Sequence, residues 1–371
     1  MEIAINLAKL GLTSSFPNPS VGCVIVECNE NYQNDRIVGS GHTQKGGRPH
    51  AEFIAIENVS FKKKKKYICY TTLEPCCHKG RSQSCVDYIL KTPIKELVMS
   101  LTDPDIRVMG KGKKALISSG INVRAGILKK KSLILYEGYF LNRIKKRPKI
   151  TLKISTSLDG NIAFPKTKNW ITNSLSREFV HHIRSMCDGI LIGNNTLNLD
   201  NPKLNCRLKG QKKFSPVRFI LSKSLSFSKK SKIFQLKESK TVIFSVFHSK
   251  RKGNFDGNEN VEVIYLKKEN YNLNFILRQI ASMGISNLLV EGGAQIFGNF
   301  LENNLVDNLL IFRSNFFIGQ LGLNAISCKS NYLKNVNDFE LREIKTFDDD
   351  HLEIFENTQH VKFKKKVLGK Y

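Results

Sequence analysis

The stretch Pro49-His50-Ala51-Glu52, followed by Leu73-Glu74-Pro75-Cys76 and then by Cys85, decides the fold expected of the first half of the chain. His50 and Glu52 form an H-x-E arrangement, in which the imidazole binds Zn²⁺ and the unligated carboxylate transfers protons. The thiolates of Cys76 and Cys85 would complete three protein ligands and leave the fourth position to water, whose pKa the metal lowers. The pattern therefore predicts a zinc-dependent deaminase site with Glu52 as its catalytic acid and base.

Two neighbouring side chains, Cys77 and His78, are alternative ligands. We prefer Cys76 because it follows Pro75 directly, and Cys77 is then a spectator thiol. Nucleoside and tRNA deaminases carry P-C-x-x-C, whereas here the eight residues 77–84 separate the two cysteines. This longer loop argues against a deaminase of that kind.

The first half has the pattern of an α/β domain. Apolar residues at helical spacing over 3–11 end at Gly11, and a second helix should follow His50 and bury Phe53, Ile54 and Ile56. Strands are expected over 21–26, 67–71, 96–100 and 121–124, and helices over 85–91 and 112–119. Strands that alternate with helices predict a sheet covered by helices.

The second half repeats this alternation after the basic segment 142–148, which ends in Pro148. A proline cannot continue a helix, so we place the boundary there, with one domain over 1–146 and another over 147–371. Strands are expected over 150–155, 189–192, 217–221, 242–245, 261–266 and 287–290, and helices over 177–185, over 275–283 and after Gly292-Gly293. The tail, with Asp348-Asp349-Asp350 and Lys364-Lys365-Lys366, is expected to form a strand pair with a frayed end.

Length and composition agree with two folded domains. At roughly 150 residues per domain, 371 residues correspond to about two, and 41% hydrophobic with 25% charged residues excludes a disordered chain. No apolar run approaches the roughly 18–20 residues that span a bilayer, and Met1-Glu2-Ile3 does not begin a signal peptide, so we expect a cytoplasmic protein with no membrane partner. Nine cysteines are an odd number, which favours reduced thiols or metal ligands over disulfides.

The net charge of +27 invites a nucleic-acid hypothesis. The excess is spread evenly, however, with 25 basic and 12 acidic residues over 1–147 (+13) and 34 and 20 over the remainder (+14). Lysine supplies 44 of the 59 basic residues, whereas base-edge recognition favours arginine. We attribute the charge to compositional bias and expect no nucleic-acid partner, with a nucleic-acid deaminase as the competing function.

The motifs of the first half resemble the deaminase half of the bifunctional riboflavin-biosynthesis deaminase/reductases, whose members carry H-A-E, L-E-P-C-x-H-x-G-[RK] and a later cysteine. The segments Pro17–Gly22 and Gly41–Glu52, with Asp103-Pro104 and Gly110-x-Gly112, also match. The resemblance implies a cytidine-deaminase-like fold in which the pyrimidine and its ribose phosphate are held by Asn18, His42, His78 and Arg81. From the residues alone, Asn18 could be a plain turn residue and Arg81 a solvated one. The chain departs from the family at Ser82-Gln83-Ser84 (usually T-P-P) and at Asp105-Ile106 (usually N-P), which bears on loop rigidity and substrate affinity.

The second half has no G-x-G-x-x-G after its first strand, so a Rossmann domain is not expected. Its motifs at 153–160, 170–172, 193–207 and 290–293 resemble the reductase half of the same family, which implies a dihydrofolate-reductase-like fold and NADPH as cofactor. By this resemblance the NADPH site would be lined by Thr156, Trp170, Thr196, Asp200, Ser222, Gly293, Ala294, Gln295, Ile296, Phe297, Gly298 and Asn299. The substrate would be contacted by Lys153, Lys168, Arg184, Leu204, Arg207 and Glu291.

Elementary chemistry supports part of this assignment. Gly292-Gly293 follows a strand and opens a helix, where backbone N–H groups and the helix dipole favour a phosphate. The guanidinium groups of Arg184 and Arg207 suit the ribose phosphate, while Lys153, Asp200 and Glu291 are candidates for assisting hydride transfer. Trp170 could instead be a core residue, and Lys153 could simply reach solvent. The segment Asn315–Gln320 departs from the family's P-K-x-I-G-G, which bears on packing near the cofactor.

The resemblance implies two reactions in sequence on one phosphorylated pyrimidine. Zinc-dependent deamination of 2,5-diamino-6-ribosylamino-4(3H)-pyrimidinone 5′-phosphate, with Glu52 passing a proton to the departing ammonia, would come first. NADPH-dependent reduction of the ribosyl group of 5-amino-6-(5-phosphoribosylamino)uracil to ribityl would follow. A homo-oligomer is expected, and the intact zinc motif opposes a binding protein with inactive sites.

Overall fold

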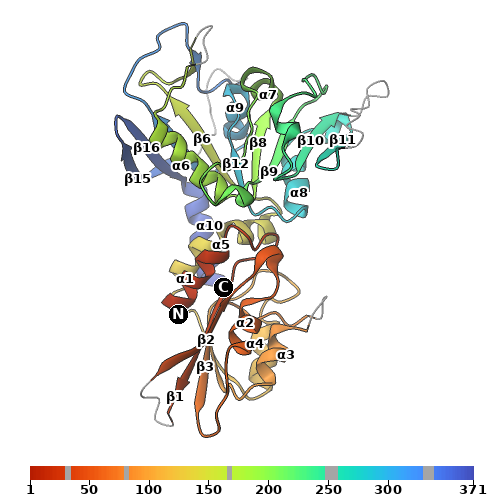
Figure 1. The fold of residues 1–371 in the computed structure, drawn as a ribbon, viewed down its shortest axis with the longest axis vertical. Helices are drawn as coiled ribbons and strands as arrows, with labels where there is room; N and C mark the ends of the chain where they lie inside the picture. The colour runs from red at the N-terminus through yellow and green to blue at the C-terminus, as the bar shows by residue number, and fades with distance from the viewer. Residues whose placement is uncertain (30–34, 79–82, 165–168, 247–257, 329–337) are drawn as a thin grey trace. The chain divides into compact units, whose positions relative to one another are not determined.

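The structure is a computed structural model that describes residues 1–29, 35–78, 83–164, 169–246, 258–328 and 338–371 (Figure 1). The chain forms two compact units, one made of Met1–Lys146 with Lys364–Tyr371 and the other of Arg147–Phe363. The last eight residues therefore cluster with the first unit, although the sequence analysis places them in the second domain. Within the described ranges, we find no helix with the length and apolar character of a membrane span.

The first unit is built on a five-stranded mixed sheet with the order β2-β1-β3-β4-β5. Its strands are β1 (Gly22–Cys28), β2 (Arg36–His42), β3 (Lys66–Leu73), β4 (Glu96–Leu101) and β5 (Asn122–Ala125). β1 pairs antiparallel with both β2 and β3, while β4 runs parallel to β3 and to β5. The sequence analysis does not anticipate β2, because two glycines in the segment R-I-V-G-S-G-H interrupt its apolar pattern.

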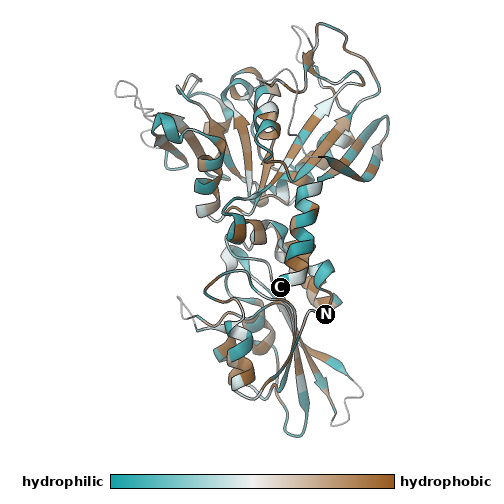
Figure 2. Cartoon of the chain, turned by 180° about the vertical axis from the view of Figure 1, so that it is seen from behind, coloured by the Kyte–Doolittle hydropathy of each residue, from teal (hydrophilic) through white to brown (hydrophobic). Residues whose placement is uncertain are grey.

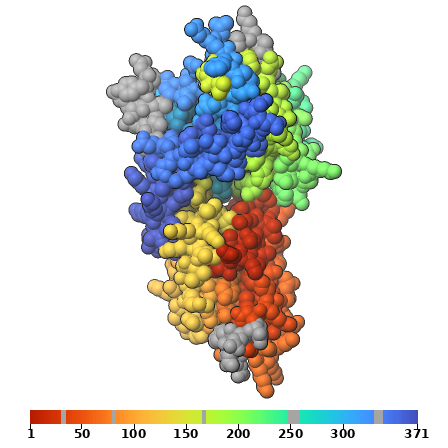
Figure 3. Space-filling model, turned by 90° about the vertical axis from the view of Figure 1, so that its left-hand side faces the viewer, coloured from red at the N-terminus to blue at the C-terminus, as the bar shows by residue number. Residues whose placement is uncertain are grey.

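Helices cover both faces of this sheet. Successive strand residues point to opposite sides, so each face presents side chains that a layer of helices can bury. Those helices are α1 (Glu2–Gly11), α2 (Ala51–Glu57), α3 (Cys85–Leu90), α4 (Lys111–Ser118) and α5 (Lys129–Lys145). α2, α3 and α4 share a core with every second residue of the strands, and Figure 2 shows the apolar residues of these strands as brown bands. α1 and α5 pack together on the other face, where Figure 3 shows them in red and yellow.

The buried face of α2 differs from the expected one. Ala51, Glu52, Ala55 and Ile56 are buried, while Phe53 and Ile54, which the sequence analysis turns inward, are only half-buried. Apolar spacing alone misplaces this face because it assumes that the buried residues are the hydrophobic ones. Here a carboxylate belongs to the interior.

The close approach of α1 to the sheet depends on a glycine of β1. A Cβ atom on Gly22 would lie 1.9 Å from the Ala4 carbonyl oxygen, so no side chain fits between the helix and the strand. The Gly22 N–H donates to Thr72 Oγ1 at 3.0 Å, and this hydroxyl lies 2.6 Å from the Tyr136 hydroxyl. Tyr136 in turn donates to the Ser20 carbonyl, so α5 holds the Pro17–Ser20 loop.

α5 is not expected from the sequence, because its residues show no clear separation into an apolar and a polar face. The C-terminal residues pack against the same helix within the first unit. The Tyr371 ring lies edge-on to Phe140 with their centroids 5.4 Å apart, and the Tyr371 carbonyl accepts the Thr102 N–H at 3.3 Å. Both ends of the described chain thus contribute to the first unit.

The second unit is built on a nine-stranded sheet with the order β11-β10-β9-β8-β12-β6-β13-β16-β15. All neighbours from β11 to β13 are parallel, and β16 and β15 add an antiparallel edge. The strands are β6 (Lys149–Thr156), β8 (Gly189–Gly193), β9 (Val217–Leu221), β10 (Thr241–Val246), β11 (Val261–Leu266), β12 (Asn287–Val290), β13 (Asn308–Arg313), β15 (Phe339–Phe347) and β16 (Asp350–Asn357). β7 (Asn161–Ala163) and β14 (Leu323–Asn324) form a separate small ladder.

The helices of the second unit follow the parallel strands, as the alternation predicts. They are α6 (Ser174–Ser185), α7 (Asn194–Asp200), α8 (Leu273–Ser282) and α9 (Ala294–Glu302). The expected C-terminal strand pair is confirmed as β15 and β16, but the expected frayed end is wrong. Lys364-Lys365-Lys366 lies in the helix α10 (Thr358–Lys370), where lysine, a good helix former, is compatible with the regular backbone.

The segment Asn315–Gln320 is well anchored despite its departure from the family pattern. The Asp159 carboxylate accepts the backbone N–H groups of Ile318 at 3.1 Å and Gly319 at 2.7 Å. Gly319 has a φ of +86°, a conformation that favours glycine, and this residue is retained. Gln320, where the family has a second glycine, is exposed, so the departure leaves the anchoring contacts in place.

Candidate active sites

Three side chains from three consecutive segments of the first unit form a metal-ligand cluster. His50 is the N-cap of α2, Cys76 follows β3, and Cys85 is the first residue of α3. His50 Nδ1 lies 3.1 Å from Cys85 Sγ and 3.5 Å from Cys76 Sγ, and the two sulfur atoms are 3.5 Å apart. Tetrahedral zinc, with bonds of about 2.0–2.3 Å, separates such ligand atoms by roughly 3.4–3.8 Å, so the cluster is close to the size that zinc requires.

The charges of the cluster also fit a dication. A hydrogen bond from Cys85 is the main cause that lowers the pKa of the Cys76 thiol to about 4, while the same bond and burial raise the pKa of Cys85. Glu52 is buried, with Oε2 at 3.4 Å from Cys85 Sγ, and burial raises its pKa. A divalent metal would compensate two thiolates next to a carboxylate.

The alternative ligands of the sequence analysis lie outside this cluster. Among the described residues the cluster contains His50, Cys76 and Cys85, whereas Cys77 Sγ faces the Arg107 carbonyl oxygen at 3.8 Å. His78 is half-buried, and its Nδ1 atom has no hydrogen-bond partner in the part of the chain that the structure describes. This ring nitrogen is available to a ligand.

The other pyrimidine-site residues are placed in different settings. Asn18 Nδ2 donates to the Gly47 carbonyl at 3.0 Å, so Asn18 connects its own loop to the segment that precedes His50. His42 is the half-buried last residue of β2. Arg81 lies outside the described residues.

Glu74 is a structural support that the sequence analysis does not single out. Its buried carboxylate accepts three backbone N–H groups, from Asp103 at 3.2 Å, Gly110 at 2.9 Å and Lys113 at 2.9 Å. Because Glu74 precedes Pro75 and Cys76, these bonds tie the loop with the metal ligand to the start of α4. The motif L-E-P-C contains this residue but does not reveal its role, because its three partners are distant in sequence.

We expect Glu74→Gln to lower the free energy of unfolding of the first unit by about 2–4 kcal/mol. The amide can accept through Oε1 only, and its NH₂ group would face backbone donors that then lose their partner. Urea unfolding of the zinc-loaded protein measures this change. The control is Glu57→Gln on the exposed side of α2, for which less than about 0.5 kcal/mol is expected. Equal effects of the two substitutions would contradict the role of Glu74.

In the second unit, several expected cofactor residues lie at the carboxyl ends of neighbouring parallel strands. Thr156 ends β6, Ser222 follows β9, and Gly293 is the N-cap of α9 after β12. Ser222 Oγ donates to Asn194 Oδ1 at 2.9 Å at the start of α7, the helix that carries Thr196. This edge is where open α/β sheets bind their ligands.

Three charged substrate candidates form a group near the same edge. Arg184 on α6 donates through Nε and Nη2 to the two Glu291 carboxylate oxygens, at 2.8 and 2.7 Å. Burial opposes ionisation of Glu291, but the charges of Arg184 and Lys153 outweigh it and lower its pKa. Lys153 is half-buried with Nζ 5.5 Å from the centre of the Phe312 ring, and burial lowers its pKa, so it does not simply reach solvent.

Arg207 is connected to this group through a residue that the sequence analysis does not single out. Its Nε atom donates to His181 Nε2 at 3.0 Å, and His181 Nδ1 lies 3.1 Å from the Asn205 carbonyl oxygen. His181 is buried on α6, one turn before Arg184. That spacing is the only signal in the sequence that could have indicated it.

We expect His181 to make the second unit more sensitive to acid. Burial, aided by the charges of Arg184 and Arg207, lowers the pKa of His181 to about 4, against about 6.5 in an unfolded chain. The unfolded state therefore gains a proton first as the pH falls. The stabilisation is complete above pH ~6.5 and is lost as the pH falls toward ~4, by up to about 3 kcal/mol.

Urea unfolding near pH 7 and near pH 4.5 tests this expectation by comparing the wild type with His181→Gln. The variant should lose about 2–3 kcal/mol less than the wild type between these two pH values, because glutamine does not titrate. An identical pH dependence of the two proteins would contradict it.

The remaining reductase candidates differ in their exposure. Leu204 is buried in the core with Ile190 and Ile220, so its side chain is not exposed to a ligand. Trp170 is 72% exposed with the Arg177 guanidinium 4.9 Å from the ring centre, so it is not a core residue. Asp200 is exposed at the end of α7, and Lys168 lies outside the described residues.

The seven-residue segment expected at the cofactor coincides with the first part of α9. Ala294, Phe297 and Gly298 are buried in the unit, Ile296 and Asn299 are half-buried, and Gln295 is exposed. Gln295 Oε1 accepts the Asn195 Nδ2 at 3.4 Å, which places the starts of α7 and α9 side by side. Gln295 is therefore the exposed residue of the segment.

The fold and the sites define a two-domain enzyme with a zinc-binding deaminase unit and a reductase unit. Two family models agree, since the cytidine and deoxycytidylate deaminase zinc-binding region matches residues 1–101 and the RibD C-terminal domain matches residues 148–352. The chain belongs to the RibD family of bifunctional riboflavin-biosynthesis enzymes. The expected fold class, a cytidine-deaminase-like domain followed by a reductase domain of this family, is confirmed.

Known relatives match nearly the whole chain. The riboflavin biosynthesis protein RibD of Aquifex aeolicus is 33% identical over 333 residues, which cover 88% of this chain and 90% of the relative. That of Buchnera aphidicola is 32% identical over 365 residues, covering 93% and 94%. The solved structure of Acinetobacter baumannii RibD has a TM-score of 0.85 at 28% identity, covering 96% of this chain and 98% of the other. A deaminase/reductase from Thermotoga maritima has a TM-score of 0.82 at 30% identity, covering 96% and 97%.

These matches establish the activity as well as the fold. The chain is a bifunctional deaminase and NADP-dependent reductase of riboflavin biosynthesis that acts on a phosphorylated pyrimidine. The competing hypothesis of a nucleic-acid deaminase, which lacks a reductase half, is thereby set aside.

Proposed function

We propose that His50, Cys76 and Cys85 hold Zn²⁺ in the first unit, and that NADPH is the cofactor of the second. The observation that carries the proposal is the cluster of these three ligands with a buried, unligated carboxylate, Glu52, 3.4 Å from the Cys85 sulfur. Removal of the 2-amino group of the diaminopyrimidine ribotide comes first, and reduction of the ribosyl group of the resulting uracil follows.

In the deamination, Glu52 moves the protons. When bound, zinc would supply a water of lowered pKa for attack on the ring carbon that bears the amino group. Glu52 would accept a proton from the attacking water and pass it to the departing ammonia, and its burial, which raises its pKa, favours the protonated state that donates. His78 Nδ1, which has no hydrogen-bond partner among the described residues, supports binding of the pyrimidine there, together with Asn18, His42 and Arg81.

In the reduction, the charged group of the second unit orients the sugar. NADPH supplies the hydride for C1′ of the ribosyl group. Lys153, whose pKa is lowered by burial, is placed beside Glu291 to give a proton as the sugar ring opens, and the Arg184–Glu291 pair holds the carboxylate in place. Arg207 binds the substrate phosphate, and Leu204 and Lys168 belong to the same proposed contact surface.

The cofactor is proposed to lie along the carboxyl ends of β6, β8, β9 and β12. The N-terminal end of α9 offers backbone N–H groups and a favourable dipole to a phosphate. The buried Thr156 Oγ1 has no hydrogen-bond partner among the residues that the structure describes, which suits a polar ligand. The proposed cofactor contacts are those of Thr156, Trp170, Thr196, Asp200, Ser222 and the segment 293–299.

The decisive experiment follows ammonia release and NADPH absorbance in one anaerobic incubation of the zinc-loaded protein with the diaminopyrimidine ribotide. Ammonia followed by NADPH oxidation supports both assignments. Removal of zinc by a chelator should stop ammonia release while reduction of the separately supplied uracil ribotide continues. Loss of the second reaction as well would contradict the separation of the two sites. Neither reaction in a protein with bound zinc would reject the proposed substrate and revive salt-sensitive RNA binding as the alternative.

We also propose a cellular location and an oligomeric state for the enzyme. A cytoplasmic location is supported by the chemistry of its thiols, because the nine cysteines are free and a reducing compartment preserves thiolate ligands. A homo-oligomer is proposed from the family resemblance, and measurement of the molar mass in solution tests it.

A further inference from the structure

The hydrogen bonds of His181 define a single form of its ring. A backbone carbonyl can only accept, so His181 Nδ1, 3.1 Å from the Asn205 carbonyl oxygen, carries the hydrogen. A guanidinium can only donate, so His181 Nε2, 3.0 Å from Arg207 Nε, offers a lone pair. Arg184 Nη1 also lies 3.5 Å from Nδ1, but it donates to the same Asn205 carbonyl at 3.4 Å, and the Nδ1 contact with that carbonyl is the shorter one. We therefore assign the hydrogen to Nδ1 and the lone pair to Nε2, which makes the ring neutral. At 8% exposure, His181 has little room to turn.

The two arginines beside this ring differ in their partners. Arg184 forms a two-bond ion pair with Glu291, which neutralises its charge. Arg207 is exposed and has no carboxylate partner within the described ranges, where the imidazole accepts its Nε–H. Its two terminal nitrogens and its full positive charge therefore remain for a ligand.

Because the His181 imidazole is a neutral acceptor, it leaves the positive charge of Arg207 available to a ligand. A carboxylate in place of His181 would orient Arg207 equally well, but it would form an ion pair and weaken attraction for an anion. A lysine would repel the guanidinium. The imidazole orients Arg207 without neutralising it, and through Asn205 it also holds the backbone two residues before Arg207.

We propose that His181 is a positioning residue of the reductase, which holds Arg207 so that its terminal nitrogens face the phosphate of the substrate. The inference rests on the proposed role of Arg207 in phosphate binding. It adds a residue that does not touch the substrate but determines how strongly the reductase prefers phosphorylated over dephosphorylated substrate.

The test compares the reduction of the aminouracil ribotide with that of the same compound without its phosphate. His181→Leu should raise KM for the phosphorylated compound by about 10- to 100-fold with a small change in kcat, because a hydrogen bond to a charged group is lost. The dephosphorylated compound should react as with the wild type. His181→Gln can accept from Arg207 and donate to Asn205, and should restore KM to within roughly 3-fold.

A matched control lies next in the sequence. His182 is exposed on the same helix, and its ring contacts Phe179, so His182→Leu should not alter the preference for phosphate. If His181→Leu impairs both substrates equally, the residue has only a structural role and the inference is wrong. Arg207→Ala tests the proposed role of Arg207 separately from that of His181. An unchanged phosphate preference in Arg207→Ala would refute phosphate binding by Arg207. Loss in Arg207→Ala but not in His181→Leu would refute the inference alone.

A measurement on the native enzyme avoids dependence on the folding of a variant. In ¹⁵N spectra of the full-length protein, the His181 ring, assigned by its absence in His181→Gln, should show a protonated Nδ1 and an unprotonated Nε2 near neutral pH. The opposite tautomer, or a doubly protonated ring, would remove the acceptor from Arg207 and overturn the inference.

Discussion

Glu52→Gln is expected to reduce ammonia release from the diaminopyrimidine ribotide by about 10³-fold or more, without loss of zinc. General acid–base catalysis contributes about 10²–10⁴-fold, and glutamine has nearly the same shape as glutamate but cannot carry the proton. Glu52 is buried beside the cluster, so no bulk water replaces it as a base. With the diaminopyrimidine substrate, NADPH oxidation should disappear too, because the uracil is no longer formed.

Two controls keep this result specific. Zinc content should remain at one per chain, because the proposed ligands are His50, Cys76 and Cys85. Reduction of uracil ribotide supplied directly should proceed at the wild-type rate. If Glu52→Gln loses its zinc, the carboxylate is a ligand and not the proton carrier, and if ammonia release persists, another group is the base.

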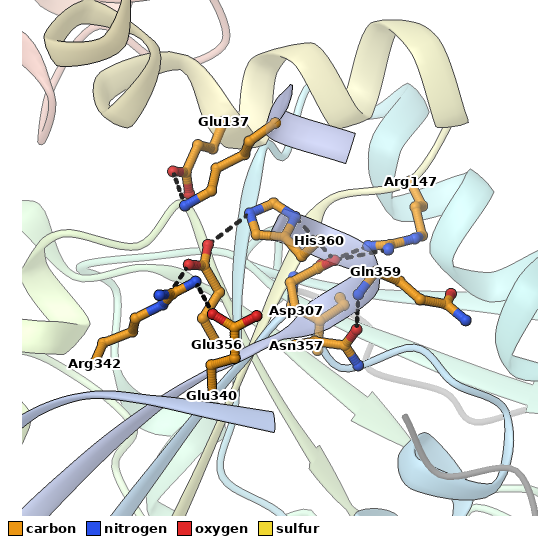
Figure 4. A network of polar contacts seen from close by, with 11 residues as sticks. Glu137, Arg147, Asp307, Glu340, Arg342, Glu356, Asn357, Gln359 and His360 are labelled. Carbon is orange, nitrogen blue, oxygen red and sulfur yellow. Dashed lines mark hydrogen bonds and ion pairs between the residues drawn. The ribbon is translucent and has the colours of Figure 1, made fainter. Parts of the chain in front are cut away.

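Asp307→Ala is expected to lower the free energy of unfolding of the second unit by about 3–5 kcal/mol, because it removes one partner of a buried ion pair. Asp307 accepts two bonds from the Arg147 guanidinium, at 2.6 and 2.8 Å (Figure 4). It accepts a third bond from the Ile150 N–H at 2.8 Å. His360 Nδ1 lies 3.4 Å from the other side of the carboxylate. The charge of Arg147 outweighs burial and lowers the pKa of Asp307, so the carboxylate is ionised at neutral pH.

Calorimetry should show this loss as a fall of about 10 °C in the unfolding temperature of the second unit. The control is Glu353→Ala, which breaks the half-exposed pair of Arg313 and Glu353 and should cost about 1 kcal/mol or less. Asp307→Asn keeps the shape and some acceptor capacity but loses the charge. Its loss of unfolding free energy should therefore lie between those of Asp307→Ala and Glu353→Ala. Equal effects of Asp307→Ala and Glu353→Ala would contradict the importance of burial for this pair.

The sequence was most informative where a chain segment is both regular and apolar. The strands expected over 217–221, 261–266 and 287–290 have those bounds in the structure. β2 and α5 were not identified, because their stability comes from contacts with distant segments and not from a local pattern. Tyr136 of α5, for example, is fixed by Ser20 and Thr72.

The site residues also divide into those with a local sequence pattern and those defined by distant contacts. His50, Glu52, Cys76 and Cys85 could be found because zinc chemistry demands particular residue types at narrow spacing. The roles of Glu74 and His181 could not be found from the sequence. They depend on backbone groups of residues that lie far away in sequence, such as Lys113 and Asn205. A spacing of one helical turn between His181 and Arg184 is too common to indicate a function.

The membership of Lys364–Tyr371 in the first unit bears on how the protein is made. Residues 1–146 are synthesised before Lys364–Tyr371, so the contacts of Tyr371 with Phe140 and Thr102 form only after the reductase unit between them has been made. The reductase unit is in effect an insertion in the deaminase unit and can fold during this interval. A polypeptide that stops at Lys146 would leave the Phe140 ring without this cover, so the shorter chain is the wrong starting point for isolating the deaminase activity.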